Sequence, residues 1–254
     1  MEIGAEAASA LGQHVSIKHM PSAQICVWHV YPDAALLLQR ATQGIERLAA
    51  EAITARGAFR VVLAGGNTPR AVYERLRDIK TAWQSWHIYF GDERCLPAGH
   101  TERNSAMASQ AWLAHVSIPA AQIHVIPAEL GAEEAARRYA LSIESVEKFD
   151  LVLLGLGQDG HTASLFPGQN YGSDFRQPAV LAVHQSPKPP ADRVSLSAWR
   201  LSEARRVWFL VTGKDKEAAV RKWRSGEDIP ALAIKPADGG DVWIDTAALG
   251  EKCN

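Results

Sequence analysis

The feature of this sequence that most restricts its fold is a repeated alternation of short apolar runs with longer amphipathic stretches. The apolar runs predict strands at residues 24–30, 59–64, 86–90, 122–126, 149–154, 206–212 and 242–245. The amphipathic stretches predict helices at residues 32–56, 69–79, 132–148 and 213–223, with a further helix beginning near residue 104. Strands separated by helices at this spacing favour parallel βαβ crossovers. We therefore predict an α/β fold with a doubly wound, mostly parallel sheet and helices on both faces.

The alternation is less regular after the run at 149–154. Residues 178–183 and 193–197 are candidate strands around a polar, proline-rich loop at residues 186–190, which predicts a smaller irregular β-containing C-terminal part. No internal repeat or linker divides the chain. We therefore expect a loosely ordered N-terminus over residues 1–20 and a single α/β domain over residues 21–254.

Composition excludes several classes of function. The chain has 254 residues, of which 47% are hydrophobic and 22% charged, so it is long enough for a substantial core. Its 27 basic and 28 acidic side chains nearly cancel, which gives no reason to expect nucleic acid or an anionic membrane as a partner, and any anion site must be local. Cys26, Cys95 and Cys253 are too few and too scattered for a disulfide framework or a cysteine zinc site. With no secretory signal and no apolar run near the ~20 residues that span a bilayer, we expect a cytoplasmic protein.

The run at 149–154 leads into a glycine-rich loop with chemically useful side chains. Glycines at positions 155, 157 and 160 permit tight turns, and they present Gln158, Asp159 and His161 where the strand ends, which is the edge at which open α/β sheets bind ligands. Histidine is the side-chain type whose usual proton equilibrium lies nearest to neutral pH, so His161 is the first candidate for a general base or acid. A tight turn in which His161 only caps backbone groups is an equally good interpretation of the loop alone.

The same loop satisfies the pattern G-x-G-x-x-G, which is typical of dinucleotide-binding loops. Its context disfavours that function. A dinucleotide loop opens a long helix, whereas Pro167 and Gly168 interrupt any helix here. The next predicted strand also runs into His184 and Gln185 rather than into an acidic residue. We therefore expect no nicotinamide cofactor.

A second loop follows the run at 59–64 and has the parts of a phosphate-binding cradle. Gly65 and Gly66 permit an open turn, Thr68 suits a helix cap and Pro69 suits the first helical position. The N-terminus of the next helix would then offer free backbone N–H groups to an oxyanion. An ordinary capped β-to-α turn needs the same residue types and remains the alternative.

A third loop carries charge directly after the run at 86–90. Arg94 can direct a bidentate fork toward a phosphate, while Asp92 accepts hydrogen bonds from hydroxyls or from a cation. The alternative is a surface ion pair. A divalent metal held by Asp92, Glu93, Asp159 and His161 is less favoured, because no paired ligand spacing such as H-E-x-x-H supports it.

Three further residues have two interpretations each. Lys214 and Arg193 either add positive charge to the same pocket or are solvated surface residues. Cys95, next to Arg94, is either a nucleophile with a lowered pKa or a small core thiol, and the core thiol is the better interpretation. No G-x-S-x-G motif indicates a serine hydrolase.

Taken together, these motifs resemble the successive signatures of the 6-phosphogluconolactonase family. They are G-G-N-T-P at residues 65–69, D-E-R at 92–94 with Asn104 downstream, and G-L-G-Q-D-G-H-T-A-S-L-F-P at 155–167. The K-P-P run at 188–190, followed by R-V-S-L at 193–196, resembles that family's lysine–proline loop and arginine-led strand. The resemblance spans residues 24–245. Asn67 departs from it, since the family often has serine or another small polar residue there, and this puts a side-chain role at position 67 in doubt.

The resemblance implies a Rossmann-like sheet shared with sugar-phosphate isomerases and deaminases. It implies no metal and no cofactor, and a small-molecule partner, 6-phospho-D-glucono-1,5-lactone, which is hydrolysed in the oxidative pentose phosphate pathway. We expect a monomer, with a dimer as the alternative. Two other functions stay open. Glucosamine-6-phosphate deaminase resembles the chain in fold but continues its motif with I-A-F-N where this chain has T-A-S-L, and a non-catalytic sugar-phosphate-binding regulator is the second.

For the lactonase function we assign roles as a hypothesis. His161 is the general base, with Asp159 as the second catalytic residue. The phosphate is held by Gly65, Gly66, Asn67, Thr68, Arg94 and Lys214. Asp92, Asn104 and Gly157 complete the sugar site, and Arg193 assists the phosphate or the oxyanion.

Overall fold

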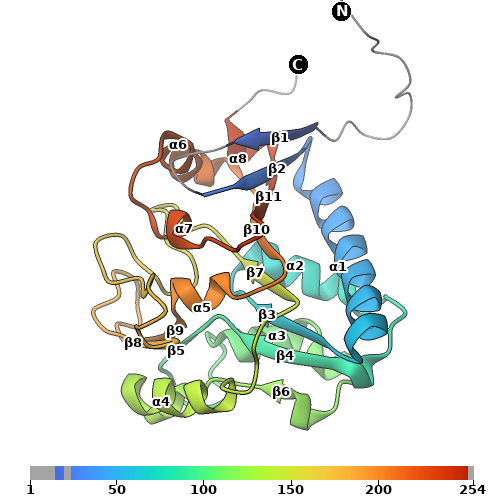
Figure 1. Cartoon of the computed structure of the whole chain (residues 1–254), viewed down its shortest axis with the longest axis vertical. Helices are drawn as coiled ribbons and strands as arrows, with labels where there is room; N and C mark the ends of the chain where they lie inside the picture. Colours follow the sequence, from blue (N-terminus) through green and yellow to red (C-terminus); the bar gives the residue numbers. More distant parts are fainter. Residues whose placement is uncertain (1–14, 20–23, 251–254) are drawn as a thin grey trace, which may run out of the picture.

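The computed structural model describes residues 15–19 and 24–250. Within them a large twisted sheet has the strand order β1-β2-β11-β10-β7-β3-β4-β6 (Figure 1). The strands are β1 Val15–His19, β2 Cys26–Tyr31, β3 Phe59–Leu63, β4 Trp86–Phe90, β6 Ile123–His124, β7 Leu151–Leu154, β10 Val207–Val211 and β11 Gly240–Asp245. Every pair is parallel except β1 with β2, so the predicted doubly wound, mostly parallel α/β sheet is confirmed.

Helices connect the strands and lie on both faces of this sheet (Figure 1). The α-helices are α1 Ala34–Arg56, α2 Asn67–Leu76, α3 Asn104–Ala111, α4 Ala132–Ser142, α5 Ala198–Ser202, α6 Glu217–Ser225, α7 Pro230–Ala233 and α8 Thr246–Leu249. Single 3₁₀ turns are η1 Trp83–Ser85, η2 Leu113–His115, η3 Ala120–Gln122, η4 Ala128–Leu130 and η5 Lys214–Lys216. Helices α1 to α3 follow one another on one side of the sheet, while α5 and α7 lie on the other.

A small antiparallel sheet lies beside the large one, in the order β5-β9-β8. Its strands are β5 Asp92–Arg94, β8 Val180–Val183 and β9 Arg193–Leu196, and α4 packs on it (Figure 1). Gly91 links the two sheets, because its N–H donates to Leu63 O at 2.9 Å and its carbonyl accepts from Leu196 N at 2.7 Å. The predicted irregular β-containing part therefore exists, but it is inserted before β10 and recruits residues 92–94 instead of forming the C-terminus.

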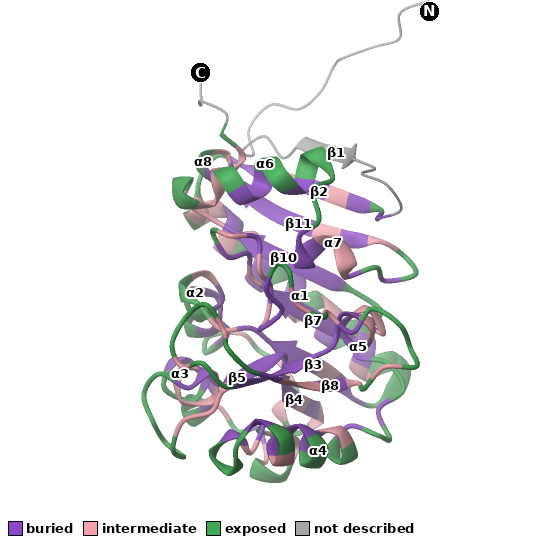
Figure 2. Cartoon of the chain, turned by 90° about the vertical axis from the view of Figure 1, so that its left-hand side faces the viewer, coloured by how far each residue is buried: buried purple, intermediate pink, exposed green. Residues whose placement is uncertain are grey.

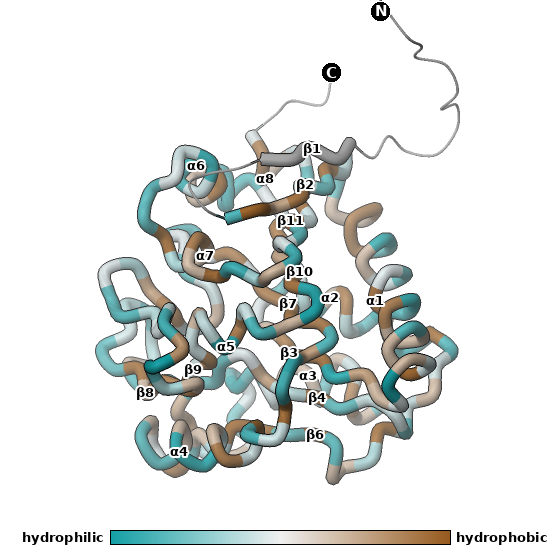
Figure 3. Tube along the Cα trace, viewed as in Figure 1, coloured by the Kyte–Doolittle hydropathy of each residue, from teal (hydrophilic) through white to brown (hydrophobic). Residues whose placement is uncertain are grey.

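Helix α1 shows how the sequence specifies its elements. Asp33 accepts a hydrogen bond from Leu36 N at 2.8 Å and so caps the start, while Gly57 ends the helix at φ 74°. Its buried stripe includes Leu37, Ala41 and Ile45, and Figure 3 shows apolar and polar residues alternating along its length. Gly44 is required in this stripe, because a Cβ there would lie 2.6 Å from Cη2 of Trp208.

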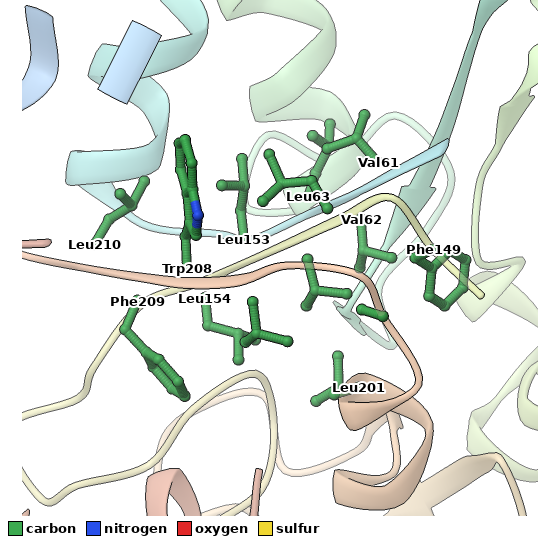
Figure 4. Packing of buried hydrophobic residues seen from close by; sticks show 14 of the residues in the cluster. Val61, Val62, Leu63, Phe149, Leu153, Leu154, Leu201, Trp208, Phe209 and Leu210 are labelled. Carbon is green, nitrogen blue, oxygen red and sulfur yellow. The ribbon is translucent and has the colours of Figure 1, made fainter. Parts of the chain in front are cut away.

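The core lies on both faces of the central strands, which are buried throughout (Figure 2). Side chains alternate along β10, so that Trp208 and Leu210 point to one face and Phe209 to the other (Figure 4). Phe209 meets Trp223 of α6 edge to face, with ring centroids 4.6 Å apart. No described helix is both long enough and apolar enough to cross a bilayer.

The structure differs from the sequence-based expectations mainly at element ends. Strand β1 was not predicted. It falls inside the expected loosely ordered stretch 1–20, whose other residues lie outside the described part of the chain. Helix α4 ends at Ser142 rather than near residue 148, and α8, which was not predicted, follows β11. The predicted helix at 213–223 begins as the 3₁₀ turn η5, because Gly213 at φ 94° turns the chain sharply out of β10.

The topology places a crevice between β3 and β7. From this neighbouring pair the chain continues outward through β4 and β6 on one side, and through β10 and β11 on the other. Loops that leave the carboxyl ends of strands at such a switch point diverge, and ligands of open α/β sheets bind there. The loops after β3 and β7 are the two glycine-rich loops of the sequence.

The sheet edge at β4 and β6 predicts acid sensitivity. The rings of His87 and His124 stack with centroids 6.0 Å apart. Burial and the charge of Arg60 lower the pKa of His87, and burial and His87 lower the pKa of His124. An unfolded chain takes up these protons below about pH 6.5 while the folded chain resists them, so the free energy of unfolding falls as the pH drops.

We therefore expect His87→Gln to reduce the loss of Tm between pH 7 and pH 5 by roughly 2–4 °C or less, since both rings are partly exposed and their effect is below about 1 kcal/mol. Scanning calorimetry at both pH values measures it. His115→Gln, at an exposed position, is the control and should keep the wild-type loss. Equal losses for wild type and His87→Gln would contradict the expectation.

Candidate active site

A cavity of about 270 Å³ opens where β3, β4, β7 and β10 end. It is lined by residues 64–69, 155–157 and 161–163, with Asp92, Arg94, Asn104, Lys188, Arg193, Leu210 and Lys216. The glycine-rich loops and the D-E-R segment thus converge on one space, although they are far apart in the sequence. This cavity is smaller than other hollows on the described surface, but it alone gathers the predicted residues.

The lysines that line the cavity differ from the lysine that the sequence predicted for the site. Lys214 begins η5 but is not a lining residue, whereas Lys216, two positions later, is. Lys188, from the proline-rich loop, also lines the cavity and had no predicted role in the site. The K-D-K sequence of η5 contains both lysines, and the direction of the turn places Lys216 rather than the predicted Lys214 at the cavity. Asp159 contacts His161 without lining the cavity.

Backbone turns hold His161 in place. Gly157 N donates to His161 O at 2.7 Å, and Gly160 N donates to Gly157 O at 3.0 Å. A Cβ at Gly157 would lie 2.0 Å from Nδ1 of His161, and one at Gly160, where φ is 92°, would lie 2.8 Å from Ile229. Both positions require glycine so that the imidazole can fold back over the loop.

The carboxylate of Asp159 orients the imidazole. Its Oδ1 lies 2.5 Å from Nδ1 of His161 and also accepts the His161 backbone N–H at 3.3 Å. Burial by itself would raise the pKa of Asp159, but the hydrogen bond and charge of His161, with a smaller contribution from Lys188, lower it overall. An ionised carboxylate accepts Nδ1–H, which leaves Nε2 as the nitrogen that can take a proton. The pair therefore has the arrangement of an oriented general base.

The N-terminus of α2 is open to the cavity. Gly66, at φ 103°, is the N-cap residue and supplies no side chain, and the backbone N–H groups of residues 66–68 form no hydrogen bond to any described residue. The roles predicted for two neighbours are wrong. Thr68 does not cap the helix, because its hydroxyl bonds that of Thr212 at 2.7 Å, and Pro69 is the third helical residue rather than the first. The free N–H groups and the helix dipole nevertheless suit an anion.

Positive side chains surround this helix end. Arg94 donates from Nη1 to Glu102 O, while its buried Nε has no hydrogen-bond partner in the described structure. Lys216 contacts Asp215 at 3.1 Å, and Asp215 also accepts from Gln158 at 3.0 Å. The cavity therefore gathers an imidazole, cations and free N–H groups in one space.

The predicted polar residues Asp92 and Asn104 are buried and bonded to each other. Nδ2 of Asn104 donates to Asp92 O at 2.9 Å and to Oδ1 at 3.0 Å, and Ser164 donates to Oδ2 at 2.6 Å. A Cβ at Gly65 would lie 2.2 Å from Oδ1 of Asn104, so Gly65 permits this close packing. Asp92 therefore ties the loop that carries His161 to α3, a role that the sequence did not indicate.

Glu93 is fully buried, so a surface ion pair is the wrong interpretation of the D-E-R segment. Its carboxylate accepts the backbone N–H groups of Arg94, Asn104 and Ser105 at 2.7–2.9 Å and so caps α3 from outside the helix. Burial, followed by the nearby Asp192, raises the pKa of Cys95 to about 11, which is unfavourable for a nucleophile. Among residues 15–19 and 24–250, no cluster of three or more His, Cys, Asp or Glu side chains has the arrangement of a metal site.

Comparison with protein families identifies the family of this chain. The model described as glucosamine-6-phosphate isomerases/6-phosphogluconolactonase matches residues 32–243. A 6-phosphogluconolactonase from Synechocystis is 34% identical over 233 residues, covering 85% of this chain and 93% of that one. One from Streptomyces coelicolor is 35% identical over 244 residues, covering 87% and 93%. The GDH/6PGL endoplasmic bifunctional protein of Oryctolagus cuniculus is 35% identical, and this chain spans only 30% of its length.

Solved structures show the same likeness. A 6-phosphogluconolactonase from Thermotoga maritima superposes with a TM-score of 0.80 at 27% identity, covering 87% of this chain and 99% of that one. One from Trypanosoma brucei superposes with a TM-score of 0.75 at 25% identity, covering 88% and 97%.

The two lysines of η5 give a matched test of the anion site. We expect inorganic phosphate to bind in the cavity, and Lys216→Ala to weaken that binding by about 3–10-fold, because a charge-assisted contact is lost. Lys214→Ala removes the same charge from outside the cavity and should leave the affinity within about 2-fold. Isothermal titration calorimetry with phosphate measures both, and a larger loss in Lys214→Ala would refute the assignment.

Proposed function

Because this chain belongs to the family of glucosamine-6-phosphate isomerases and 6-phosphogluconolactonases, we propose that it hydrolyses 6-phospho-D-glucono-1,5-lactone to 6-phospho-D-gluconate. This reaction is the second step of the oxidative pentose phosphate pathway. One observation carries the proposal: a single cavity is lined by His161, which Asp159 orients, by the open N-terminus of α2 and by four cationic side chains, Arg94, Lys188, Arg193 and Lys216. A lactone with a phosphate at its far end needs both a base and an anion site.

The chemistry requires one base and one water. A δ-lactone is an activated ester, so water can attack C1 directly and no covalent intermediate with the protein is needed. Nε2 of His161 takes a proton as the water oxygen bonds to C1, and a tetrahedral intermediate forms. The C1–O bond of the ring then breaks, and His161 returns the proton to the departing ring oxygen. The carboxylate of Asp159 stabilises the imidazolium between these steps.

Binding of the phosphate at the N-terminus of α2 would fix the distance from C1 to the base. We assign the phosphate to the N–H groups of residues 66–68, to Arg94 and to Lys216, which takes the role expected of Lys214. Lys188 and Arg193 add positive charge near the lactone end or the phosphate. Asp92 and Asn104 shape the sugar site through their mutual bonds. Contacts that hold the substrate with C1 next to the base increase the rate of hydrolysis.

We further propose that the protein is a monomer with a single domain over residues 21–254 and that it acts in the cytoplasm. The residues that line the cavity come from both halves of the sequence, which supports a single domain rather than two separable ones. Size-exclusion chromatography with light scattering tests the monomer.

A coupled assay tests the activity. Glucose-6-phosphate dehydrogenase generates the lactone in place, and this protein should remove it faster than spontaneous hydrolysis, in the presence of a chelator. Glucosamine 6-phosphate should yield no ammonia. Lactone loss at the spontaneous rate would refute the proposal, and ammonia release would assign the chain to the deaminase branch of the family.

His161→Ala should lower kcat by roughly 10²–10⁴-fold, because proton transfer to and from the reacting oxygens is lost. KM should change little, since the phosphate contacts remain. Calorimetric binding of inorganic phosphate, unchanged from wild type, is the control for an intact cavity. A kcat within about 2-fold of wild type would remove His161 from the mechanism.

Arg94→Ala should weaken recognition of the substrate phosphate and leave proton transfer by His161 intact. We expect its kcat/KM for the phosphorylated lactone to fall by about 10-fold or more, and its kcat/KM for unphosphorylated glucono-1,5-lactone to stay within about 2-fold. Parallel assays with the two lactones measure the difference. Equal losses on both would argue against a phosphate contact.

A further inference from the structure

The ring of Phe166 lies between two polar groups of the cavity that come from different segments. Its centroid is 4.9 Å from that of the His161 ring, and the guanidinium carbon of Arg193 lies over the Phe166 ring, 5.6 Å from its centroid. Phe166 is buried, with 1% of its surface exposed. It does not line the cavity, so it touches both functional groups from behind.

A tight hairpin brings Phe166 beside His161. Thr162 and Leu165 pair antiparallel, with Thr162 N donating to Leu165 O at 3.3 Å and Leu165 N donating to Thr162 O at 3.0 Å. The residues that flank such a pair come out on neighbouring positions, so the rings of His161 and Phe166 meet. The hairpin requires Ala163 to adopt φ 48°, a strained value for a residue with a Cβ.

Hydrogen bonds from the small sheet hold this hairpin. The Ser164 hydroxyl donates to Asp92 at 2.6 Å, and Ser164 N donates to the Ser195 hydroxyl at 3.3 Å. Ser195 belongs to β9, two residues after Arg193. The hairpin and the arginine are therefore mounted on the same small sheet.

Arg193 in turn holds the loop that carries Lys188. Its Nη2 donates to the carbonyls of Lys188 and Pro189 at 3.0 Å each, and its Nε donates to that of Pro190 at 3.3 Å. The guanidinium is thus committed to the backbone of this loop and packs its face on Phe166. A displacement of the aromatic ring would move the base on one side and the Lys188 loop on the other.

We propose that Phe166 is a positioning residue for the hydrolysis proposed above, on which this inference rests: its ring sets the separation between the general base His161 and the arginine-held loop that carries Lys188. An aromatic ring is rigid and offers a face to a cation, which a branched aliphatic side chain of similar apolarity does not. Misplacing a catalytic group by about 1 Å can cost on the order of 10² in rate, so a rigid spacer has a measurable effect.

A purely structural role for this buried ring would give a different result from a positioning role. If Phe166 only fills the core, a substitution lowers Tm but leaves the kcat of the folded protein unchanged, provided that the assay temperature is well below Tm. If the ring positions His161 and Arg193, activity follows the presence of the ring. Phe166→Tyr keeps the ring but buries a hydroxyl, and Phe166→Leu removes the ring but stays apolar, so the two substitutions separate the possibilities.

We expect both variants to lose Tm, whereas only Phe166→Leu loses kcat, by about 10-fold or more, with Phe166→Tyr within about 3-fold of wild type. Phe175→Leu is the matched control. Phe175 is exposed and has its own arginine, Arg176, 5.2 Å from its ring centroid, but lies outside the cavity wall. It should keep wild-type kcat. Tm by calorimetry and kcat in the coupled assay are the readouts.

A double-mutant cycle tests the link to Arg193. We expect Phe166→Leu and Arg193→Lys each to lower kcat. The product of their two fold-losses should exceed the fold-loss of the double variant by at least about 5-fold, because each substitution disrupts the same spacer. The cycle of Phe175→Leu with Arg193→Lys should be multiplicative. Independent losses in the first cycle, or a kcat in Phe166→Tyr as low as in Phe166→Leu, would overturn the inference. An inactive wild-type protein would refute the proposed function and the inference with it.

Discussion

The site depends on hydrogen bonds to the backbone N–H and carbonyl groups at the points where two parallel strands end. A buried tyrosine replaces the missing ladder bonds at each strand end: Tyr73 bonds both N and O of Ala64 at 2.9 Å, and Tyr139 bonds N and O of Phe90 at 2.8 and 3.1 Å. Burial raises the pKa of both hydroxyls, so they remain protonated and able to donate. Because these hydroxyls pair the backbone groups of Ala64 and Phe90, the loops after β3 and β4 can diverge and line a cavity.

The carboxylates of the site are already hydrogen-bonded to other groups of the protein. Cations face the cavity, while the carboxylates next to them are committed elsewhere: Glu93 to backbone N–H groups, Asp92 to Asn104 and Ser164, and Asp159 to His161. A chain with a net charge of −1 can therefore present a positive surface to one phosphate. Buried carboxylates with full sets of hydrogen bonds also fix the geometry of the side chains in front of them.

Much of the site was predictable because glycine and histidine leave local signals. Gly157 and Gly65 mark positions where a Cβ would collide with His161 and Asn104, and their spacing is visible in the sequence. The roles of Glu93 and Phe166 were not predictable, because each acts on residues that only the folded chain brings near. The hydrogen bonds from Arg193 to the carbonyls of residues 188–190 were likewise not predictable from the sequence.

The sequence by itself determined the order and type of the main elements, the parallel sheet and the loops that carry the chemistry, because these follow from local periodicity and from turn residues. Only the tertiary structure decided that Asp92–Arg94 joins the small sheet, that Val15–His19 adds an edge strand, and that Lys216 rather than Lys214 lines the cavity. The physical reason is the distance along the chain over which each interaction acts. Hydrophobic period and glycine conformations act within a few residues, whereas sheet partners and the direction of a charged side chain depend on groups that are distant in the sequence.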